Sequence, residues 1–346
     1  MIENKVLYSL DDVMIQPAAV TFISHRGDIK TTYDDGMLPL FTSPMPCVVS
    51  LKDNQYKKYL DAKINAIIPR TEGLVDRISF LNHRFEHPNV FVAFSLDEFN
   101  DIFINHKYFI NIGNDVLMRV LVDIACGSMY SLHDSIKTVK AAYGNKICIM
   151  SGNVANPESF YKLAEAGCDY IRCSVGSGSG CCTATYTGVY YPMASLIDEC
   201  RKKSDKFATK PKIIADGGIT TYRNAFKALA LGADYVMMGS RLCQCEDSAG
   251  EIIDKGESLR QRYNRRKLYF GMASEMGSQL LGKDATAPEG MVKEYPVLEP
   301  IAEYGRLFSR YLASTMSYCN AIYLRDFIGK CILNPISQNA QKQFNQ

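Results

Sequence analysis

The sequence predicts an α/β protein of the (β/α)8 TIM-barrel class, and two observations support this. Eight short apolar segments recur along the chain, and most are apolar throughout rather than alternating with polar residues. Such segments are typical of parallel strands covered on both faces. Amphipathic stretches of helical period separate several of them, and strand–helix alternation repeated eight times predicts a closed barrel. An open, doubly wound sheet is the alternative that the same pattern allows.

Each expected element is bounded by turn residues or by a change of period. The expected strands are 38–42, 66–69, 90–95, 120–124, 147–151, 170–174, 212–215 and 235–238. The expected helices are 131–143, 157–166, 192–202 and 221–231, with a longer helical pattern over 301–328. No linker divides the chain, so we expect one catalytic barrel domain over 1–336 and a polar, frayed tail over 337–346. Gly, Asp, Thr and Pro over 282–289 predict a mobile active-site loop.

Composition excludes several classes of partner. The chain has 346 residues, a net charge of +2 and 12 cysteines. A charge this small gives no broad attraction to nucleic acid or to a membrane surface. No apolar run is long enough to span a bilayer and the first residues start no signal peptide, so we expect a cytoplasmic protein. The cysteines form no C-x-x-C pair, so zinc is not expected and most of them should be buried.

A glycine-rich loop follows the sixth expected strand and carries a candidate nucleophile, Cys181. The loop runs Gly176-Ser177-Gly178-Ser179-Gly180-Cys181-Cys182-Thr183. Glycines let backbone N–H groups approach an anion, and a cysteine near such donors is enriched in thiolate. From spacing alone, a flexible Gly/Ser turn with incidental cysteines is also open. A cysteine–histidine hydrolase would need a histidine beside Cys181, and the five histidines all lie elsewhere in the sequence.

Two further segments predict a phosphate site. Asp216-Gly217-Gly218 ends the seventh strand just before a helix, and a carboxylate there suits the two hydroxyls of a ribose. Gly239-Ser240 follows the eighth strand and adds phosphate donors. The last strands of TIM barrels often hold phosphate, although each segment alone is also explained as a helix cap with a glycine turn.

These motifs, taken together, resemble the IMP dehydrogenase / GMP reductase family over nearly the whole chain. The matching segments, in the family's order, are Leu10–Pro17, Pro39–Met45, Val122–Ala125, Ser151–Val154, the Cys181 loop, the Asp216 turn, Gly239-Ser240, Tyr269–Met272 and Glu289-Gly290. The string G-x-G-S-x-C-x-T is highly specific in that setting.

The resemblance implies roles for individual residues. Cys181 would bond covalently to C2 of a purine nucleotide, with Thr183 and Glu289 as further catalytic residues. Potassium would be held by backbone carbonyls of Gly176, Gly178 and Cys181, and the assembly would be a homotetramer. Implied nicotinamide cofactor contacts are Asp123, Asn153 and Arg172. Implied substrate contacts are Ser43, Ser179, Asp216, Gly217, Gly218, Gly239, Ser240, Tyr269, Met272 and Gly290.

Two reactions of the family fit: NADPH-dependent reduction of GMP to IMP and ammonia, and NAD-dependent oxidation of IMP to XMP. The dehydrogenase hydrolyses its intermediate with an Arg-Tyr pair on a mobile flap. The stretch 277–288 contains neither residue, and 70–90 leaves no room for the dehydrogenases' regulatory insert. Both observations favour the reductase.

Other features depart from the reductase pattern. Arg172 and Ser177 look more like dehydrogenases, and Pro46, Pro69-Arg70 and Cys126 stand where other residues are usual. A catalytically silent nucleotide-binding barrel is therefore an alternative of another class, and a phosphate-binding isomerase or aldolase without nicotinamide is a further one.

Overall fold

The chain forms a barrel of eight parallel strands in a computed structural model, which describes residues 5–84, 87–113, 117–254, 265–282, 284 and 287–343. The strand order around the barrel is β2-β9-β8-β7-β6-β5-β4-β3. β2 and β3 meet at a parallel bridge, where Asn65 donates to the Leu40 carbonyl at 3.0 Å. The predicted (β/α)8 barrel is therefore confirmed. The barrel strands are β2 (Leu40–Thr42), β3 (Ala66–Ile68), β4 (Val90–Phe94), β5 (Met118–Asp123), β6 (Ile147–Val154), β7 (Tyr170–Cys173), β8 (Lys212–Asp216) and β9 (Tyr235–Met238).

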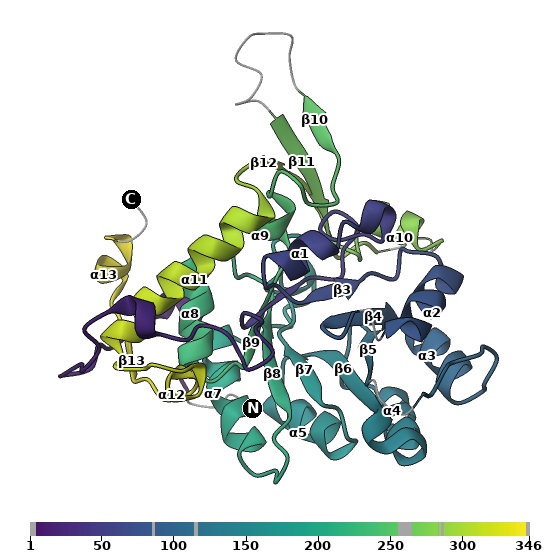
Figure 1. Cartoon of the computed structure of the whole chain (residues 1–346), viewed down its shortest axis with the longest axis horizontal. Helices are drawn as coiled ribbons and strands as arrows, with labels where there is room; N and C mark the ends of the chain where they lie inside the picture. Colours follow the sequence, from purple (N-terminus) through teal and green to yellow (C-terminus); the bar gives the residue numbers. More distant parts are fainter. Residues whose placement is uncertain are drawn as a thin grey trace.

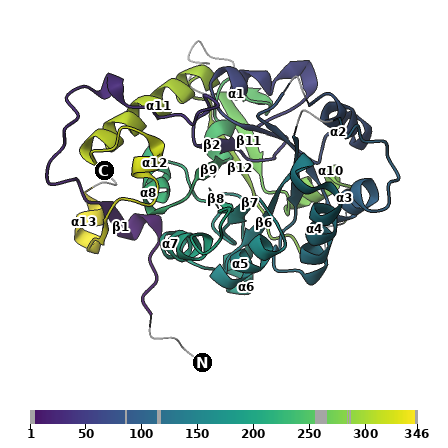
Figure 2. The ribbon, with the colours of Figure 1, turned by 60° about the horizontal axis from the view of Figure 1, so that its bottom comes forward.

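Helices cover the outside of the strands (Figure 2). The four shorter helices predicted from the sequence are present, with ends shifted by one or two residues. Their starts follow from local chemistry. The Asn156 side chain accepts the Glu158 N–H at 2.7 Å ahead of Pro157, and Thr221 caps α8 in the same way. The helices are α1 (Lys57–Asp61), α2 (Leu74–Asn82), α3 (Leu96–Phe103), α4 (Tyr130–Tyr143), α5 (Pro157–Glu165), α6 (Thr183–Thr187), α7 (Met193–Ser204), α8 (Tyr222–Leu231), α9 (Ser240–Cys243), α10 (Glu275–Leu280), α11 (Ile301–Tyr318), α12 (Leu324–Phe327) and α13 (Gln338–Lys342).

Aromatic rings fill one end of the barrel interior. Phe41, Phe91, Tyr170 and Tyr235 form a cluster in which neighbouring ring centroids lie 4.9–6.2 Å apart. Tyr170 opens β7 and Tyr235 opens β9, so the cluster lies toward the amino-terminal ends of the strands. Because this end is packed with large side chains, a cavity has room only toward the carboxyl ends, where barrel enzymes bind their substrates.

Two small antiparallel sheets extend the barrel, and the sequence analysis did not predict either of them. β10 (Ile252–Asp254), β11 (Arg265–Phe270) and β12 (Val292–Pro296) form a ribbon that projects from the barrel at the top of Figure 1. β1 (Val13–Ile15) pairs with β13 (Leu333–Pro335), so segments near the two ends of the chain lie side by side. The strands of both sheets are short, and three of the five have only three residues, too few for a period to be recognised.

The helix expected over 301–328 ends earlier, at Tyr318. Asn320 adopts a left-handed conformation with φ 55°, which an asparagine tolerates and which stops the helix. The Asn320 side chain then accepts the Phe22 N–H at 2.9 Å, which ties the amino-terminal segment to this turn. The short helix α12 follows as a separate element.

Two predicted segments lie partly outside the described residues. In the expected mobile loop, 283, 285 and 286 are outside, and in the tail, 344–346 are outside. The described part of the tail contains α13, whose first turn Ser337 caps, so this part is helical rather than frayed. That 1–336 act as one catalytic domain stays a prediction. Within the described residues, no helix combines the length and the apolar character needed to cross a membrane.

Candidate active site

A cavity opens where the barrel strands reach their carboxyl ends, and it gathers the residues predicted from the sequence. Gly290 is absent from its lining but pairs with Cys181 in an antiparallel bridge. The other predicted residues all line it: Ser43, Asp123, Asn153, Arg172, Gly176, Gly178, Ser179, Cys181, Thr183, Asp216, Gly217, Gly218, Gly239, Ser240, Tyr269, Met272 and Glu289.

The Cys181 loop is held against the segment that carries Glu289. The Cys182 N–H donates to the Glu289 carbonyl at 2.6 Å, and the Met291 N–H donates to the Gly180 carbonyl at 3.0 Å. The loop also folds back on itself, because the Cys181 N–H donates to Gly178 at 2.9 Å. These backbone bonds fix the nucleophile relative to a carboxylate that is distant in sequence.

The packing beneath this loop requires glycine. A Cβ on Gly271 would lie 2.4 Å from the Gly180 carbonyl oxygen, closer than any side chain can approach a backbone atom. Gly271 belongs to the Tyr269–Met272 motif, and its missing side chain lets that motif pass directly under the Cys181 loop.

Cys181, Thr183 and Glu289 form a continuous line of contacts. The Cys181 Sγ donates to the Thr183 Oγ1 at 3.2 Å, and this hydroxyl donates to Glu289 Oε2 at 2.6 Å. Thr183 is the first residue of α6, two positions after the nucleophile. A threonine hydroxyl has one proton and two lone pairs, so it can accept a proton from sulfur while it passes its own to the carboxylate.

Hydroxyl groups converge on the other side of the cavity. Ser179 Oγ and Ser240 Oγ lie 3.0 Å apart. A Cβ built on Gly239 would lie 2.8 Å from the Tyr269 hydroxyl and 3.1 Å from Ser43 Oγ, so both hydroxyls reach the same point. Burial raises the pKa of Tyr269 well above its ordinary value, and the phenol therefore remains a donor. Such a set of donors suits an anion.

A chain of alternating charges crosses the cavity floor. Arg70 Nε donates to Asp123 Oδ2 at 3.0 Å, and Arg172 Nη1 donates to Asp123 Oδ1 at 2.7 Å. Arg172 Nε continues the chain to Asp216 Oδ2 at 2.9 Å, where Asn153 Nδ2 also donates at 2.8 Å. Arg172 and Asp216 are buried. This series of charged groups joins Asp123 and Arg172, which are expected at the cofactor, to Asp216, which is expected at the ribose.

The charges set the protonation state of Asp123. Burial alone would raise its pKa, but the guanidinium groups of Arg172 and Arg70 outweigh burial and lower the pKa below its ordinary value. Asp123 therefore stays ionised and can only accept hydrogen bonds. Arg70 was among the departures from the reductase pattern and was not predicted to belong to the site. Its position directly after β3, at the same edge as the other site residues, is the signal that would have identified it.

Comparison with known proteins identifies the family of the chain. A model of the IMP dehydrogenase / GMP reductase domain matches residues 79–345. The chain belongs to the IMP dehydrogenase / GMP reductase family. This is a family of oxidoreductases, and the chain carries the family's barrel.

The similar proteins include both IMP dehydrogenases and GMP reductases. An inosine-5'-monophosphate dehydrogenase of Chlorobaculum parvum is 36% identical over 214 residues, which are 58% of this chain and 41% of that protein. GMP reductase 2 of Mus musculus is 30% identical over 232 residues, 64% of each chain. A GMP reductase of Escherichia coli is 30% identical over 236 residues, 67% of this chain and 65% of that protein. The matches thus span less than two thirds of these relatives' own lengths.

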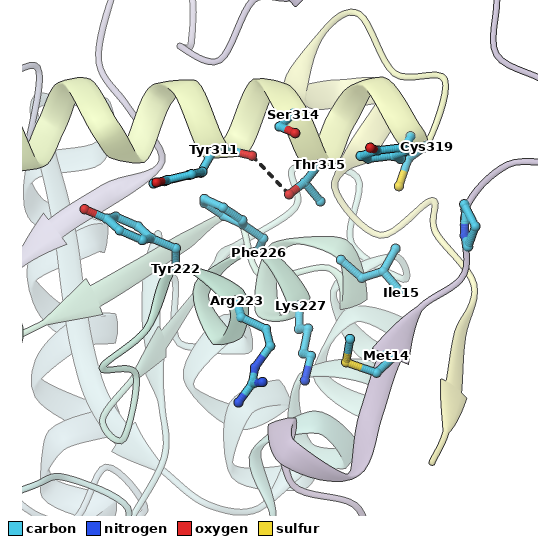
Figure 3. Close-up of a pocket in the computed structure, with 12 residues that line it drawn as sticks. Met14, Ile15, Tyr222, Arg223, Phe226, Lys227, Tyr311, Ser314, Thr315 and Cys319 are labelled. Carbon is cyan, nitrogen blue, oxygen red and sulfur yellow. Dashed lines mark hydrogen bonds between the residues drawn. The ribbon is translucent and has the colours of Figure 1, made fainter. Parts of the chain in front are cut away.

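A second pocket lies on the outer surface of the barrel and shares no lining residue with the cavity that contains Cys181. It lies between α8, α11 and β1, and Figure 3 shows its aromatic and basic side chains. It contains none of the predicted site residues, and the Lys227 Nζ at its edge already donates to the Leu10 carbonyl at 2.8 Å. Its lining residues are Met14, Ile15, Pro17, Tyr222, Arg223, Phe226, Lys227, Tyr311, Ser314, Thr315, Tyr318 and Cys319.

Proposed function

We propose that the chain is a GMP reductase, which uses NADPH to convert GMP to IMP and ammonia through a covalent bond between Cys181 and the purine. The observation that supports this most strongly is the line of contacts from the Cys181 sulfur through Thr183 to Glu289. A reductive deamination needs a nucleophile at C2 and a group that protonates the departing amine, and this line provides both.

In this proposal, the thiol proton moves through the Thr183 hydroxyl to Glu289 while sulfur bonds to C2 of GMP. Glu289 then returns a proton through Thr183 to the 2-amino group, which leaves as ammonia when its bond to C2 breaks. C2 gains a hydride, which the reduced nicotinamide cofactor supplies, and the C2–S bond breaks to release IMP. The hydride takes the place of the amino group on C2, and the departing Cys181 thiolate takes up one proton from solvent, so GMP, NADPH and H⁺ give IMP, ammonia and NADP⁺.

The remaining residues are proposed to hold the ligands. The hydroxyls of Ser179, Ser240 and Tyr269 suit the 5′-phosphate, with the Gly217, Gly218 and Gly239 backbones close by. Asp216 suits the ribose. Ser43, Met272, Glu289 and Gly290 suit the purine. Asp123, Asn153 and Arg172 lie on the cavity floor and fit a neighbouring nicotinamide. The homotetramer, the cytoplasmic location and a potassium ion at the carbonyls of Gly176, Gly178 and Cys181 belong to the same proposal.

IMP dehydrogenase is the second candidate, and the match to the Chlorobaculum parvum enzyme favours it. The reductase is preferred because the segment 277–288 contains no arginine or tyrosine to activate the hydrolytic water.

Product analysis tests the proposal. The protein is mixed with GMP and NADPH and, separately, with IMP and NAD, and nucleotides are separated by chromatography while ammonia is assayed. We expect IMP and ammonia in equal amounts in the first mixture only. XMP in the second mixture, without turnover in the first, would assign the dehydrogenase, and nucleotide binding without turnover in either would assign a silent barrel.

A further inference from the structure

Protein donors already occupy one of the two carboxylate oxygens of Asp216. Asp216 Oδ2 accepts from Arg172 Nε at 2.9 Å and from Asn153 Nδ2 at 2.8 Å, and Arg172 Nη2 also lies 2.9 Å from it. Within the described part of the chain, no hydrogen bond reaches Oδ1. The Asp216 side chain is mostly buried and lines the cavity, so a sugar bound there would shield Oδ1 from bulk water.

The occupied oxygen changes how a sugar can bind. A carboxylate with two open oxygens can take one hydroxyl of a ribose on each, and a 2′-deoxy sugar then leaves one buried oxygen without a donor. An unpaired buried acceptor is strongly unfavourable, and this is how polar sites reject ligands that lack a hydroxyl. In this protein Oδ2 keeps its donors from Arg172 and Asn153 with either sugar. A single sugar hydroxyl on Oδ1 is therefore enough to give both carboxylate oxygens a hydrogen-bond donor.

Arg172 cannot easily turn away from Asp216 to make room for a second hydroxyl. Its Nη1 is bound to Asp123 Oδ1 at 2.7 Å, and only 9% of its side chain is exposed. Asp123 is held in turn by Arg70, so moving Arg172 would break two buried ion pairs. The donors on Oδ2 are therefore a fixed part of the site.

We propose that the nucleotide site accepts 2′-deoxyribonucleotides nearly as well as ribonucleotides, because the 3′-hydroxyl alone satisfies Asp216 Oδ1. This inference rests on the proposed function, in which Asp216 is the sugar contact. The substrate class then becomes purine nucleoside monophosphates with either sugar.

The experiment compares GMP with dGMP. The ratio of kcat/KM values with NADPH is measured together with the ratio of dissociation constants from calorimetry. We expect both ratios, GMP over dGMP, to favour the ribonucleotide by less than about tenfold. A preference of tenfold or more in the dissociation constants overturns the inference.

Two substitutions that remove donors from Oδ2 make the test sharper. Arg172→Met leaves Oδ2 with the Asn153 donor alone, and Asn153→Ala leaves it with the Arg172 donors alone, so in each variant Oδ2 can accept the second sugar hydroxyl. We expect the preference for GMP to rise by roughly 10-fold in Arg172→Met, in line with one hydrogen bond to a charged group, and by less in Asn153→Ala, where two donor atoms of Arg172 remain. Because the readout is a ratio of two substrates, a general loss of activity in either variant cancels.

Arg70→Met is the matched control, since Arg70 contacts Asp123 but not Asp216. The sugar preference of this variant should equal that of the wild type. An unchanged preference in both Arg172→Met and Asn153→Ala overturns the inference. If neither GMP nor dGMP is turned over, the proposed reductase fails, while the two dissociation constants still decide the question of the sugar.

Discussion

The Glu289 carboxylate accepts the Thr183 hydroxyl at 2.6 Å, although the two residues are 106 positions apart in the sequence. The pairing is held by the backbone as well, because the Cys182 N–H donates to the Glu289 carbonyl. The carboxylate is thus positioned by the same contacts that shape the Cys181 loop, and the proposed proton transfer and nucleophilic attack would take place at residues held together by these bonds.

Removing the nucleophile separates binding from chemistry. We expect Cys181→Ala to lower kcat by roughly 10³-fold or more, because no covalent intermediate forms, while the dissociation constant for GMP changes only a few-fold. Steady-state kinetics and calorimetry measure the two quantities. Cys182→Ala is the control, since the neighbouring Cys182 is buried and does not line the cavity. Turnover near the wild-type rate in Cys181→Ala would exclude covalent catalysis.

The Thr183–Glu289 pair gives a second prediction. Glu289→Gln keeps the shape of the side chain but cannot take a proton, so kcat should fall by about 10²- to 10⁴-fold with little change in KM. Thr183→Val should behave similarly, and Thr183→Ser, which restores the hydroxyl, should recover most of the activity. A Thr183→Val enzyme as active as Thr183→Ser would show that the hydroxyl passes no proton.

The proposed phosphate site predicts the effect of one added methyl group. Gly239→Ala places a Cβ 2.8 Å from the Tyr269 hydroxyl and 3.1 Å from Ser43 Oγ. We expect the hydroxyls to be displaced and the affinity for GMP to fall by about tenfold or more, as for one or two lost charge-assisted hydrogen bonds. Guanosine, which lacks the phosphate, should lose less affinity in the variant than GMP does, since of the two displaced hydroxyls only that of Ser43 is assigned to the purine. An equal loss for guanosine would contradict a phosphate role.

Arg70 predicts a pH dependence of stability. Arg70→Met removes one of the two cations that lower the pKa of Asp123, so this pKa should rise. A carboxyl with a lowered folded-state pKa stabilises the fold above its unfolded pKa of about 3.9, and it loses this effect as pH falls through the folded value. The variant should therefore be less stable than wild type by about 1–3 kcal/mol at pH 7. The difference should shrink toward pH 3, as urea denaturation at several pH values can measure.

The barrel was predictable because its signal is repeated. Strands such as Val90–Phe94 are buried along their whole length and the other barrel strands along most of it, and eight such segments leave little room for another fold. The site residues were predictable for a related reason, since Asp123 and Asp216 both end parallel strands and such ends meet at one edge. The family motifs then supplied the roles.

The contacts between distant residues were not predictable. Nothing local shows that Arg172 joins Asp123 to Asp216, because each bond depends on strand register in the folded barrel. The end of α11 was not predicted, because it is accompanied by a contact with a segment that is distant in the sequence. An asparagine is compatible with a helix, so Asn320 alone did not mark the end. In the structure its side chain accepts the Phe22 N–H at the turn where the helix stops.

The pairing of β1 with β13 has a consequence for biosynthesis. Val13 leaves the ribosome long before its partner Pro335, which lies far downstream in the sequence. β2 is in a similar position, because one of its neighbours in the barrel is β9. Such distant pairings form late and slowly, so β1 and β2 have unsatisfied backbone groups until their partner strands have been made. During that interval the growing polypeptide offers exposed edges to chaperones and to aggregation.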